Sequence, residues 1–444
     1  MIQIIAISFI FLLFYGLVNL WGDDFSIKKE SNYKILDIVA VFMLVLSTGG
    51  LLFVFNRNLS YGVFILLLIA LLILGKKIKK KVFNPILLSL LTFLSLLILN
   101  FLFNQNQSIN TYGFYSIMIF SCCLLFLHFS NNKNSNYFLE CIYFSLQLIM
   151  LHALCNFFIY FFVKNNLSII AMSDGERTYK TFENLFFFGG EKNDYGTFNL
   201  FGVECARNQG LFWEPGVLQF FLNMLFFLEA FVLKRKKYLL LLISFLIIST
   251  YSTIGIALLL IQSVVFILSE FKRNKTLAII LIIAAIPVYT VFNVNFNEKI
   301  IGEKSASSQK RIYDLVQPLE IAKNNPFFGI GLDANNFKNE RNRFEVSRTK
   351  ILGIEYKFDE GNEIVTNSVT FLIAALGFPT AILFLYLLVF KQSIIYNKKW
   401  LLILIVLFSA SSEPLLLKPF MFMFIFSGLY AFFYKLTSHK NQLL

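Results

Sequence analysis

Long apolar runs alternate with short polar connections along almost the whole chain. A helix rises about 1.5 Å per residue, so about 20 mainly apolar residues cross a hydrocarbon core of about 30 Å. By this measure thirteen helices are expected, at residues 2–20, 35–55, 59–75, 82–103, 112–129, 137–163, 211–233, 238–250, 252–269, 276–292, 366–390, 400–412 and 419–434. The pattern predicts an all-α polytopic membrane protein with about 13 transmembrane helices.

The apolar stretch at residues 238–270 is too long for one helix, because it would reach about 50 Å. The polar run Ser249–Thr253 lies at its midpoint, and basic clusters flank both ends. Two short helices, one entering the membrane and the next returning, would keep both basic clusters on the same side of the membrane. Such short helices are tolerated when they pack inside a bundle.

Positive charge is sorted by side. The short connections opposite to the main basic set hold only Arg57 and Lys418. The Lys and Arg of the main set lie on alternate connections, at residues 28–34, 76–81, 133, 234–237, 272–275, 391–399 and 435–440. Cytoplasmic loops carry the Lys and Arg excess, so we expect the N-terminus outside and the C-terminus inside the cell.

Composition agrees with a membrane location, since 57% of the 444 residues are apolar and 15% are charged. We treat residues 1–444 as a single membrane domain with a first outer loop at 164–210 and a large outer loop, the cap, at 293–365. The net charge of +13 lies on the loop rims, so the bilayer is the expected partner and nucleic acid is not. The five cysteines have no metal-ligand spacing, and no cofactor or metal is expected.

The cap carries eleven basic and eleven acidic residues, which indicates a folded surface of mixed charge. Within it, apolar residues recur at helical spacing up to the stop at Asn324–Pro326. They are Ile312, Leu315, Val316, Leu319 and Ala322. We expect an amphipathic helix of about four turns, kinked at Pro318, across the outer mouth.

The first candidate site is the segment 207–216, directly before an apolar run. Pro215 suits the first turn of a helix, and Trp213 suits the membrane interface. The positive end of that helix, beside Arg207, would form an anion site. The alternative is that Arg207 reaches lipid headgroups and Glu214 pairs with it. The aromatic residues of the first outer loop could stack on sugars, or simply pack on the membrane surface.

The second candidate lies in the cap. Arg311 stands early in the amphipathic helix, where it could clamp a second phosphate. Asn325, Gly329 and Gly331 follow the helix stop, and the glycines permit close backbone approach. A lone Gly-x-Gly is weak as a nucleotide motif, and a simple turn is the favoured interpretation for the glycines alone.

The third candidate precedes the next apolar run, where Glu363 leads into Thr366 and Asn367. Glu363 could act as a general base, although acids at a helix start more often cap it. Asn367 could contact substrate.

In order, these features resemble the O-antigen polymerase and ligase superfamily over roughly residues 200–390. They are an Arg-x-x-Gly…Pro motif at 207–215, a helix pair broken at 249–253, a large outer loop with Arg311, the Asn-Pro-Phe-x-Gly-x-Gly turn at 325–331 and Asn-Ser at 367–368. The resemblance implies a glycan on an undecaprenyl diphosphate carrier, with Arg207 and Arg311 holding the donor diphosphate.

The chain departs from the superfamily pattern in ways that bear on the reaction. Ligases of the superfamily are expected to have a histidine beside the Asn at the helix start, where this chain has Thr366. An arginine common after the Ser/Thr break is replaced by Thr253. The spaced Arg-to-Gly repeat of some polymerases is not met either. Neither outer loop contains a histidine, which favours a polymerase over a ligase.

The hypothesis is a glycosyltransferase that uses a polyprenyl-diphosphate-linked glycan donor. It would join undecaprenyl-diphosphate-linked repeat units into O-antigen or capsular polysaccharide on the outer face of the bacterial cytoplasmic membrane. Arg207, Arg311, Glu214 and Glu363 are the catalytic candidates; Trp213, Asn325, Gly329, Gly331 and Asn367 are the substrate-binding candidates. A chain-length regulator and a flippase are candidate partners.

Two alternatives stay open. One is a ligase that transfers finished glycan to an acceptor. The other is a flippase or transporter for lipid-linked sugar, which would show inverted repeats and ionisable residues at mid-membrane. The helices are nearly free of charge apart from Glu140 and Glu229, while the polar residues gather in the outer loops. That distribution favours an outward-facing enzyme.

Overall fold

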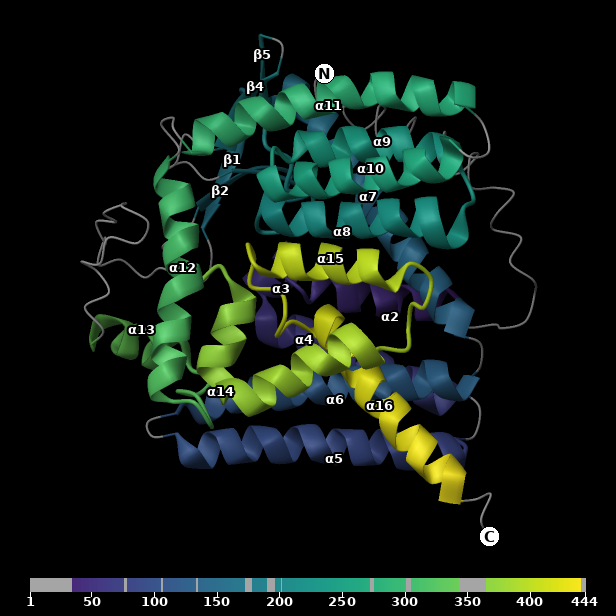
Figure 1. Cartoon of the computed structure of the whole chain (residues 1–444), viewed down its shortest axis with the longest axis vertical. Helices are drawn as coiled ribbons and strands as arrows, with labels where there is room; N and C mark the ends of the chain where they lie inside the picture. Colours follow the sequence, from purple (N-terminus) through teal and green to yellow (C-terminus); the bar gives the residue numbers. More distant parts are fainter. Residues whose placement is uncertain are drawn as a thin grey trace. The chain divides into compact units, whose positions relative to one another are not determined.

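The computed structural model describes residues 34–75, 78–104, 107–132, 135–171, 178–189, 196–200, 202–271, 275–300, 305–343 and 365–440. The helix predicted at 2–20 therefore lies outside the described residues. The chain divides into two compact units. Unit 1 comprises Met1–Val63 and Glu140–Tyr289, and unit 2 comprises Phe64–Leu139 and Thr290–Leu444. Figure 1 labels helices and strands of both units.

The described elements are mainly apolar helices. In chain order they are α2 (Lys34–Leu46), α3 (Leu51–Phe55), α4 (Arg57–Leu74), α5 (Lys80–Phe103), α6 (Ile109–Asn132), α7 (Ser135–Val163), α8 (Pro215–Phe227), α9 (Lys237–Ser249), α10 (Thr253–Phe271), α11 (Lys275–Ile300), α12 (Ser305–Asn324), α13 (Ala334–Arg343), α14 (Ser368–Tyr386), α15 (Lys399–Ala410) and α16 (Pro419–Lys440). Single π-helical segments continue α8 and α14, namely η2 (Leu228–Leu233) and η4 (Leu387–Lys391).

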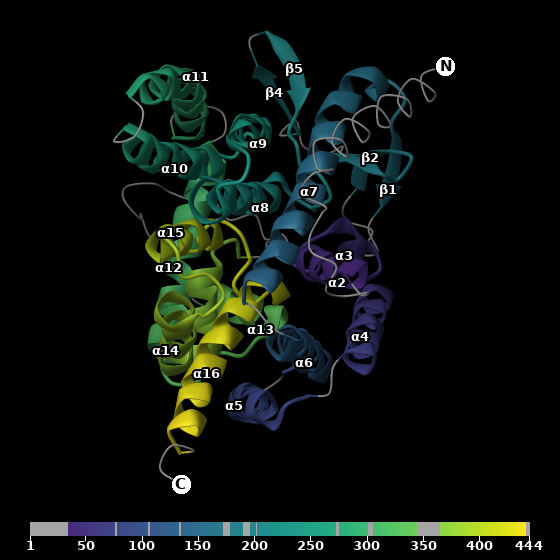
Figure 2. The same cartoon turned by 90° about the vertical axis from the view of Figure 1, so that its right-hand side faces the viewer.

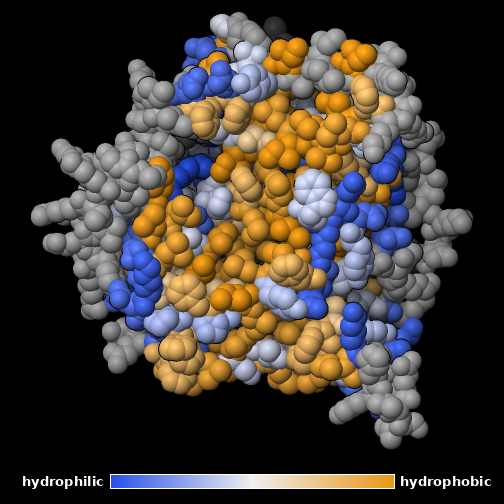
Figure 3. Space-filling view, viewed as in Figure 1, coloured by the Kyte–Doolittle hydropathy of each residue, from blue (hydrophilic) through white to orange (hydrophobic). Residues whose placement is uncertain are grey.

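Eight helices among the described residues are long and apolar enough to cross a membrane, and three shorter helices are also apolar. The short ones include α9 and α15. Figure 3 shows hydrophobic side chains over much of the face in view, as expected for helices that contact lipid. The prediction of an all-α polytopic membrane protein is confirmed.

The predicted helix at 35–55 is divided into α2 and α3 by the run Ser47–Gly50. The Ser47 hydroxyl donates to the carbonyl of Leu44 at 2.7 Å, which competes with continuation of the helix. Gly49 has a φ of +132°, and a Cβ there would meet the Trp213 ring at 2.9 Å. Close packing on Trp213 therefore explains a break that hydrophobicity alone does not show.

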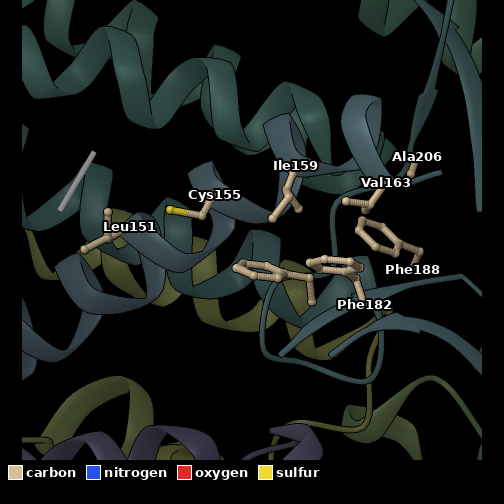
Figure 4. Close-up of a cluster of buried hydrophobic side chains, with 8 residues drawn as sticks. Leu151, Cys155, Ile159, Val163, Phe182, Phe188 and Ala206 are labelled. Carbon is tan, nitrogen blue, oxygen red and sulfur yellow. The ribbon is translucent and has the colours of Figure 1, made fainter. Parts of the chain in front are cut away.

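In unit 1, the segment predicted as the first outer loop, residues 164–210, contains two small antiparallel sheets. One has the order β1-β2-β3 (Ser168–Ala171, Thr178–Phe182, Phe186–Phe188), and the other pairs β4 (Thr197–Leu200) with β5 (Val203–Ala206). Phe182 and Phe188 pack with Ile159 and Val163 of α7 (Figure 4). The phenylalanines of this loop therefore anchor the sheet to the end of α7.

The helices α8, α9 and α10 of unit 1 lie side by side (Figure 1). The α9–α10 pair confirms the two short helices expected at 238–269, with a turn at the Ser/Thr run. Glu229 of η2 is buried and accepts hydrogen bonds from the Tyr143 hydroxyl at 2.5 Å and from the Lys236 amide. Arg235 pairs with Glu140 at 3.2 Å. Glu140 and Glu229, the two acids within the apolar runs, therefore both bind residues of the basic connection between η2 and α9.

In unit 2, α16 packs across α5 and α6 (Figure 2). Phe93 of α5 lies at their centre and contacts Phe384, Phe422 and Phe426. The predicted cap helix is α12, which is longer than its apolar spacing indicated and continues through Pro318. It runs beside α14 (Figure 1).

Candidate functional site

Arg207 of unit 1 is held by the turn between α9 and α10. Its Nε donates to the carbonyl of Thr250 at 3.2 Å, and its amide donates to Gly196 at 2.8 Å. Thr250 is the C-cap of α9, so this carbonyl carries the partial negative charge of a helix end. The fold thus fixes the base of the guanidinium to the Ser/Thr break that the sequence singled out.

Asn208 is a residue that sequence reasoning missed. It is only 1% exposed, and its Nδ2 donates to the Ala153 carbonyl at 2.8 Å and to the Ser249 hydroxyl at 3.1 Å. Its Oδ1 accepts from Asn156 Nδ2 at 3.2 Å and from the Gly210 amide at 3.1 Å. Asn208 therefore ties the Arg207 segment to α7 and to the end of α9.

Pro215 is the first residue of α8, as predicted, and Glu214 is the N-cap. The Glu214 side chain makes no capping hydrogen bond. Trp213 packs against Gly49, and its amide donates to the Gly49 carbonyl at 3.1 Å. Its carbonyl accepts from the Tyr179 hydroxyl at 3.1 Å. Trp213 is thus a packing residue here, and its contact with substrate stays a prediction.

Gln209 is a further polar side chain in this segment. It is 2% exposed, and its Nε2 has no hydrogen-bond partner among the described residues. A buried amide donor of this kind normally binds a water molecule or a ligand oxygen.

The turn after α12, residues 325–333, is docked by its backbone onto α14. The amides of Ile330 and Gly331 donate to the carbonyls of Ala374 and Ala375 at 2.9 and 3.0 Å. Gly329 has a φ of +65°, and a Cβ there would collide with the Ala374 and Ala375 backbone. The two glycines of the motif therefore permit close packing, and substrate binding by them stays a prediction.

The same turn is bound by α5 and α6. Asn100 donates through Nδ2 to the carbonyls of Phe328 at 2.6 Å and Ala375 at 3.0 Å. Its Oδ1 accepts from the Tyr112 hydroxyl at 2.5 Å. Asn325 stays close to its own helix, with Nδ2 donating to the Ile321 carbonyl at 3.4 Å. Residues far apart in sequence thus fix the position of this turn.

Asn367 is the N-cap of α14. Its Oδ1 accepts from the amides of Val369 at 3.1 Å and Thr370 at 3.2 Å. The helix begins where the sequence predicted, and the cap satisfies two donors that would otherwise lack partners. Glu363 lies outside the described residues.

The candidates fall into two groups. Arg207, Trp213 and Glu214 belong to unit 1. The other described candidates belong to unit 2; they are Arg311, Asn325, Gly329, Gly331 and Asn367. The structure defines the surroundings of each group, and a shared role for the two arginines stays a prediction.

Comparison with known proteins gives a family match over part of the chain. No curated protein matches the chain. Residues 238–385 match the family model described as O-antigen ligase. The matched region contains α9, α10, α12 and most of α14, and with them every unit 2 candidate named above. The resemblance inferred from the sequence is confirmed over this range, because residues 238–385 are similar to the O-antigen ligase family.

Proposed function

We propose that the protein is a polymerase that joins undecaprenyl-diphosphate-linked oligosaccharide repeat units into O-antigen or capsular polysaccharide. The reaction would take place on the outer face of the bacterial cytoplasmic membrane. The observation that carries the proposal is the family match at 238–385, which overlaps the Arg311 helix and the turn that binds Arg207.

The chemistry is a glycosyl transfer. A hydroxyl of one carrier-linked repeat unit attacks the anomeric carbon of the growing chain, and a new carbon–oxygen bond forms. The bond between that carbon and the diphosphate breaks, so undecaprenyl diphosphate leaves with the electron pair. The hydroxyl proton passes to a base, for which Glu214 and Glu363 are the candidates. The leaving group already carries negative charge, so its stabilisation requires mainly positioned cations.

Arg207 and Arg311 would supply those cations. Arg207 precedes the N-terminus of α8 by a short segment, and Arg311 lies within α12, the helix that packs on α14. A helix N-terminus and an arginine together favour a bound phosphate.

A polymerase is favoured over a ligase by the residue at the start of α14. Where a ligase of the superfamily is expected to have histidine, Thr366 donates its hydroxyl to Asp314 at 2.7 Å. The three histidines are His128 and His152, in α6 and α7, and His439 near the chain end. The outer loops therefore offer no imidazole to accept a proton.

The test is deletion of the gene in its native host, followed by sizing of the surface glycan and of the carrier-linked glycan. We expect single repeat units in place of long chains, and wild-type gene on a plasmid should restore the long chains. Long chains left on the carrier would indicate a ligase instead. Repeat units trapped on the cytoplasmic side would indicate a flippase and contradict the enzymatic proposal.

A further inference from the structure

Asp314 is a fully buried carboxylate on α12 that binds the start of α14. Its Oδ2 accepts from the Thr366 amide at 3.0 Å and from the Thr366 hydroxyl at 2.7 Å. Its main-chain carbonyl accepts from the Thr370 hydroxyl at 3.0 Å. A single residue therefore joins α12 to both sides of the Asn367 cap.

The start of α14, to which Asp314 binds, is also bound by the segment that follows α15. The Ser368 hydroxyl donates at 2.7 Å to the carbonyl of Ala410, the last residue of α15. The amide of Leu415 in turn donates to the Ser368 Oγ at 3.2 Å. The start of α14 is thus anchored to the turn after α15, and α12 is fixed against an anchored point.

Arg311 stands three residues before Asp314, on the same side of α12. It is half-buried, and within the described part of the chain no hydrogen bond or ion pair joins it to another residue. The same helix shows what this spacing can do, because Glu320 and Lys323 form an ion pair at 2.6 Å. Arg311 and Asp314 form no such ion pair; Asp314 directs its Oδ2 to Thr366 instead.

We infer that Asp314 is a positioning residue for Arg311. By binding Thr366, it fixes the register of α12 on α14 and leaves the guanidinium available for an anion. The inference rests on the proposed function, because it assigns Arg311 to the donor diphosphate. Asp314 itself touches protein groups and is not a catalytic residue.

The experiment is a double-mutant cycle with purified protein and undecaprenyl-diphosphate-linked repeat units, measuring release of undecaprenyl diphosphate. Arg311→Ala removes a charge-assisted contact, so kcat/KM should fall about 10- to 100-fold. We expect Asp314→Ala to give a similar fall, and the Asp314→Ala/Arg311→Ala double variant to be no slower than Arg311→Ala alone. Asp314→Ala combined with Arg207→Ala should multiply the two losses.

Asp314→Asn is the variant that separates positioning from charge. The amide oxygen can still accept both bonds from Thr366, so we expect kcat/KM within about threefold of wild type and an unchanged pH profile. Glu320→Gln, an exposed change on the same helix, is the control and should be silent. All variants are compared at equal amounts of monodisperse protein.

Four results would overturn the inference. Multiplied losses in Asp314→Ala/Arg311→Ala would mean that the two residues act independently. Inactivity of Asp314→Asn would mean that the carboxylate charge is required. Full activity of Arg311→Ala would mean that Arg311 has no role for Asp314 to support. If Arg207→Ala were fully active as well, the assignment of the two arginines to the donor diphosphate would also be wrong. If Asp314→Ala alone had normal activity, the positioning role would be wrong and the proposed function would stand.

Discussion

Asn208 and Asp314 each join segments that are far apart in the chain. Asn208 binds Ser249, which is 41 residues away, and Asp314 binds Thr366, which is 52 residues away. Pro215 and Asn367 were placed correctly because a helix start depends on residues within one turn of it. Local capping is therefore readable from sequence, whereas long-range polar contacts require the fold.

Asn208→Ala should destabilise unit 1 and weaken activity through Arg207. The change leaves Asn156, Ser249 and the Gly210 amide without their Asn208 partner. Asn156 and Ser249 each keep a bond to a main-chain carbonyl, whereas the buried Gly210 amide loses its acceptor. An unpaired buried donor costs about 1–3 kcal/mol, so thermal unfolding in detergent should shift to lower temperature. Asn199→Ala on β4, where the side chain is exposed, is the matched control and should change stability by less than about 0.5 kcal/mol. Equal melting temperatures for both variants would contradict the role of Asn208.

Among the helices, hydrophobic patterning predicted existence and type, and it missed interruptions. The helix expected at 366–390 contains a break at Gly377, where φ is +77° and ψ is +165°. There the Phe378 amide donates to the Pro326 carbonyl at 2.8 Å, outside its own helix. The neighbouring Gly377 and Pro379 were the available signal, since Pro lacks an amide hydrogen. Such a break cannot be predicted from the apolar pattern, because the residues on both sides of it are apolar whether or not one amide bonds outside the helix.

Gly329→Ala should destabilise the docking of the turn onto this break. The new Cβ meets the Ala374 and Ala375 backbone, and alanine is strained at a φ of +65°. Overpacking and the left-handed conformation together should cost about 2–5 kcal/mol. Gly113→Ala in α6 is the control, because a Cβ there meets open space and a helical alanine is favoured by about 0.5–1 kcal/mol. The measurement is thermal unfolding of the two variants; a Gly329→Ala protein as stable as wild type would refute the packing role.

For the chain as a whole, each unit repeats one succession of elements. In unit 1, α8 continues into η2 and is followed by the short helix α9 and then by α10. In unit 2, α14 continues into η4 and is followed by the short helix α15 and then by α16. A lysine with a left-handed backbone stands in each connection that leads to the short helix, Lys234 in one and Lys398 in the other. No repeat is apparent in the residues themselves, because it consists of helix lengths and turns. The prediction of a single membrane domain stays a prediction.

This shared succession, with the charge pattern, predicts that the connections containing Lys234 and Lys398 both face the cytoplasm and that both outer loops face outward. Single cysteines test it with a membrane-impermeant maleimide on intact cells. Lys180→Cys and Asn324→Cys, both at exposed positions, should react on intact cells. Lys80→Cys and Asn397→Cys, also exposed, should react only after permeabilisation.

The background labelling of the native cysteines should be low, because all five are buried. Burial and the nearby Glu204 raise the pKa of the Cys205 thiol, so at neutral pH less of it is the reactive thiolate, and its labelling should increase as the pH rises. Reaction of Asn397→Cys on intact cells would reverse the orientation, and would place the candidate arginines on the wrong side for an extracytoplasmic polymerase.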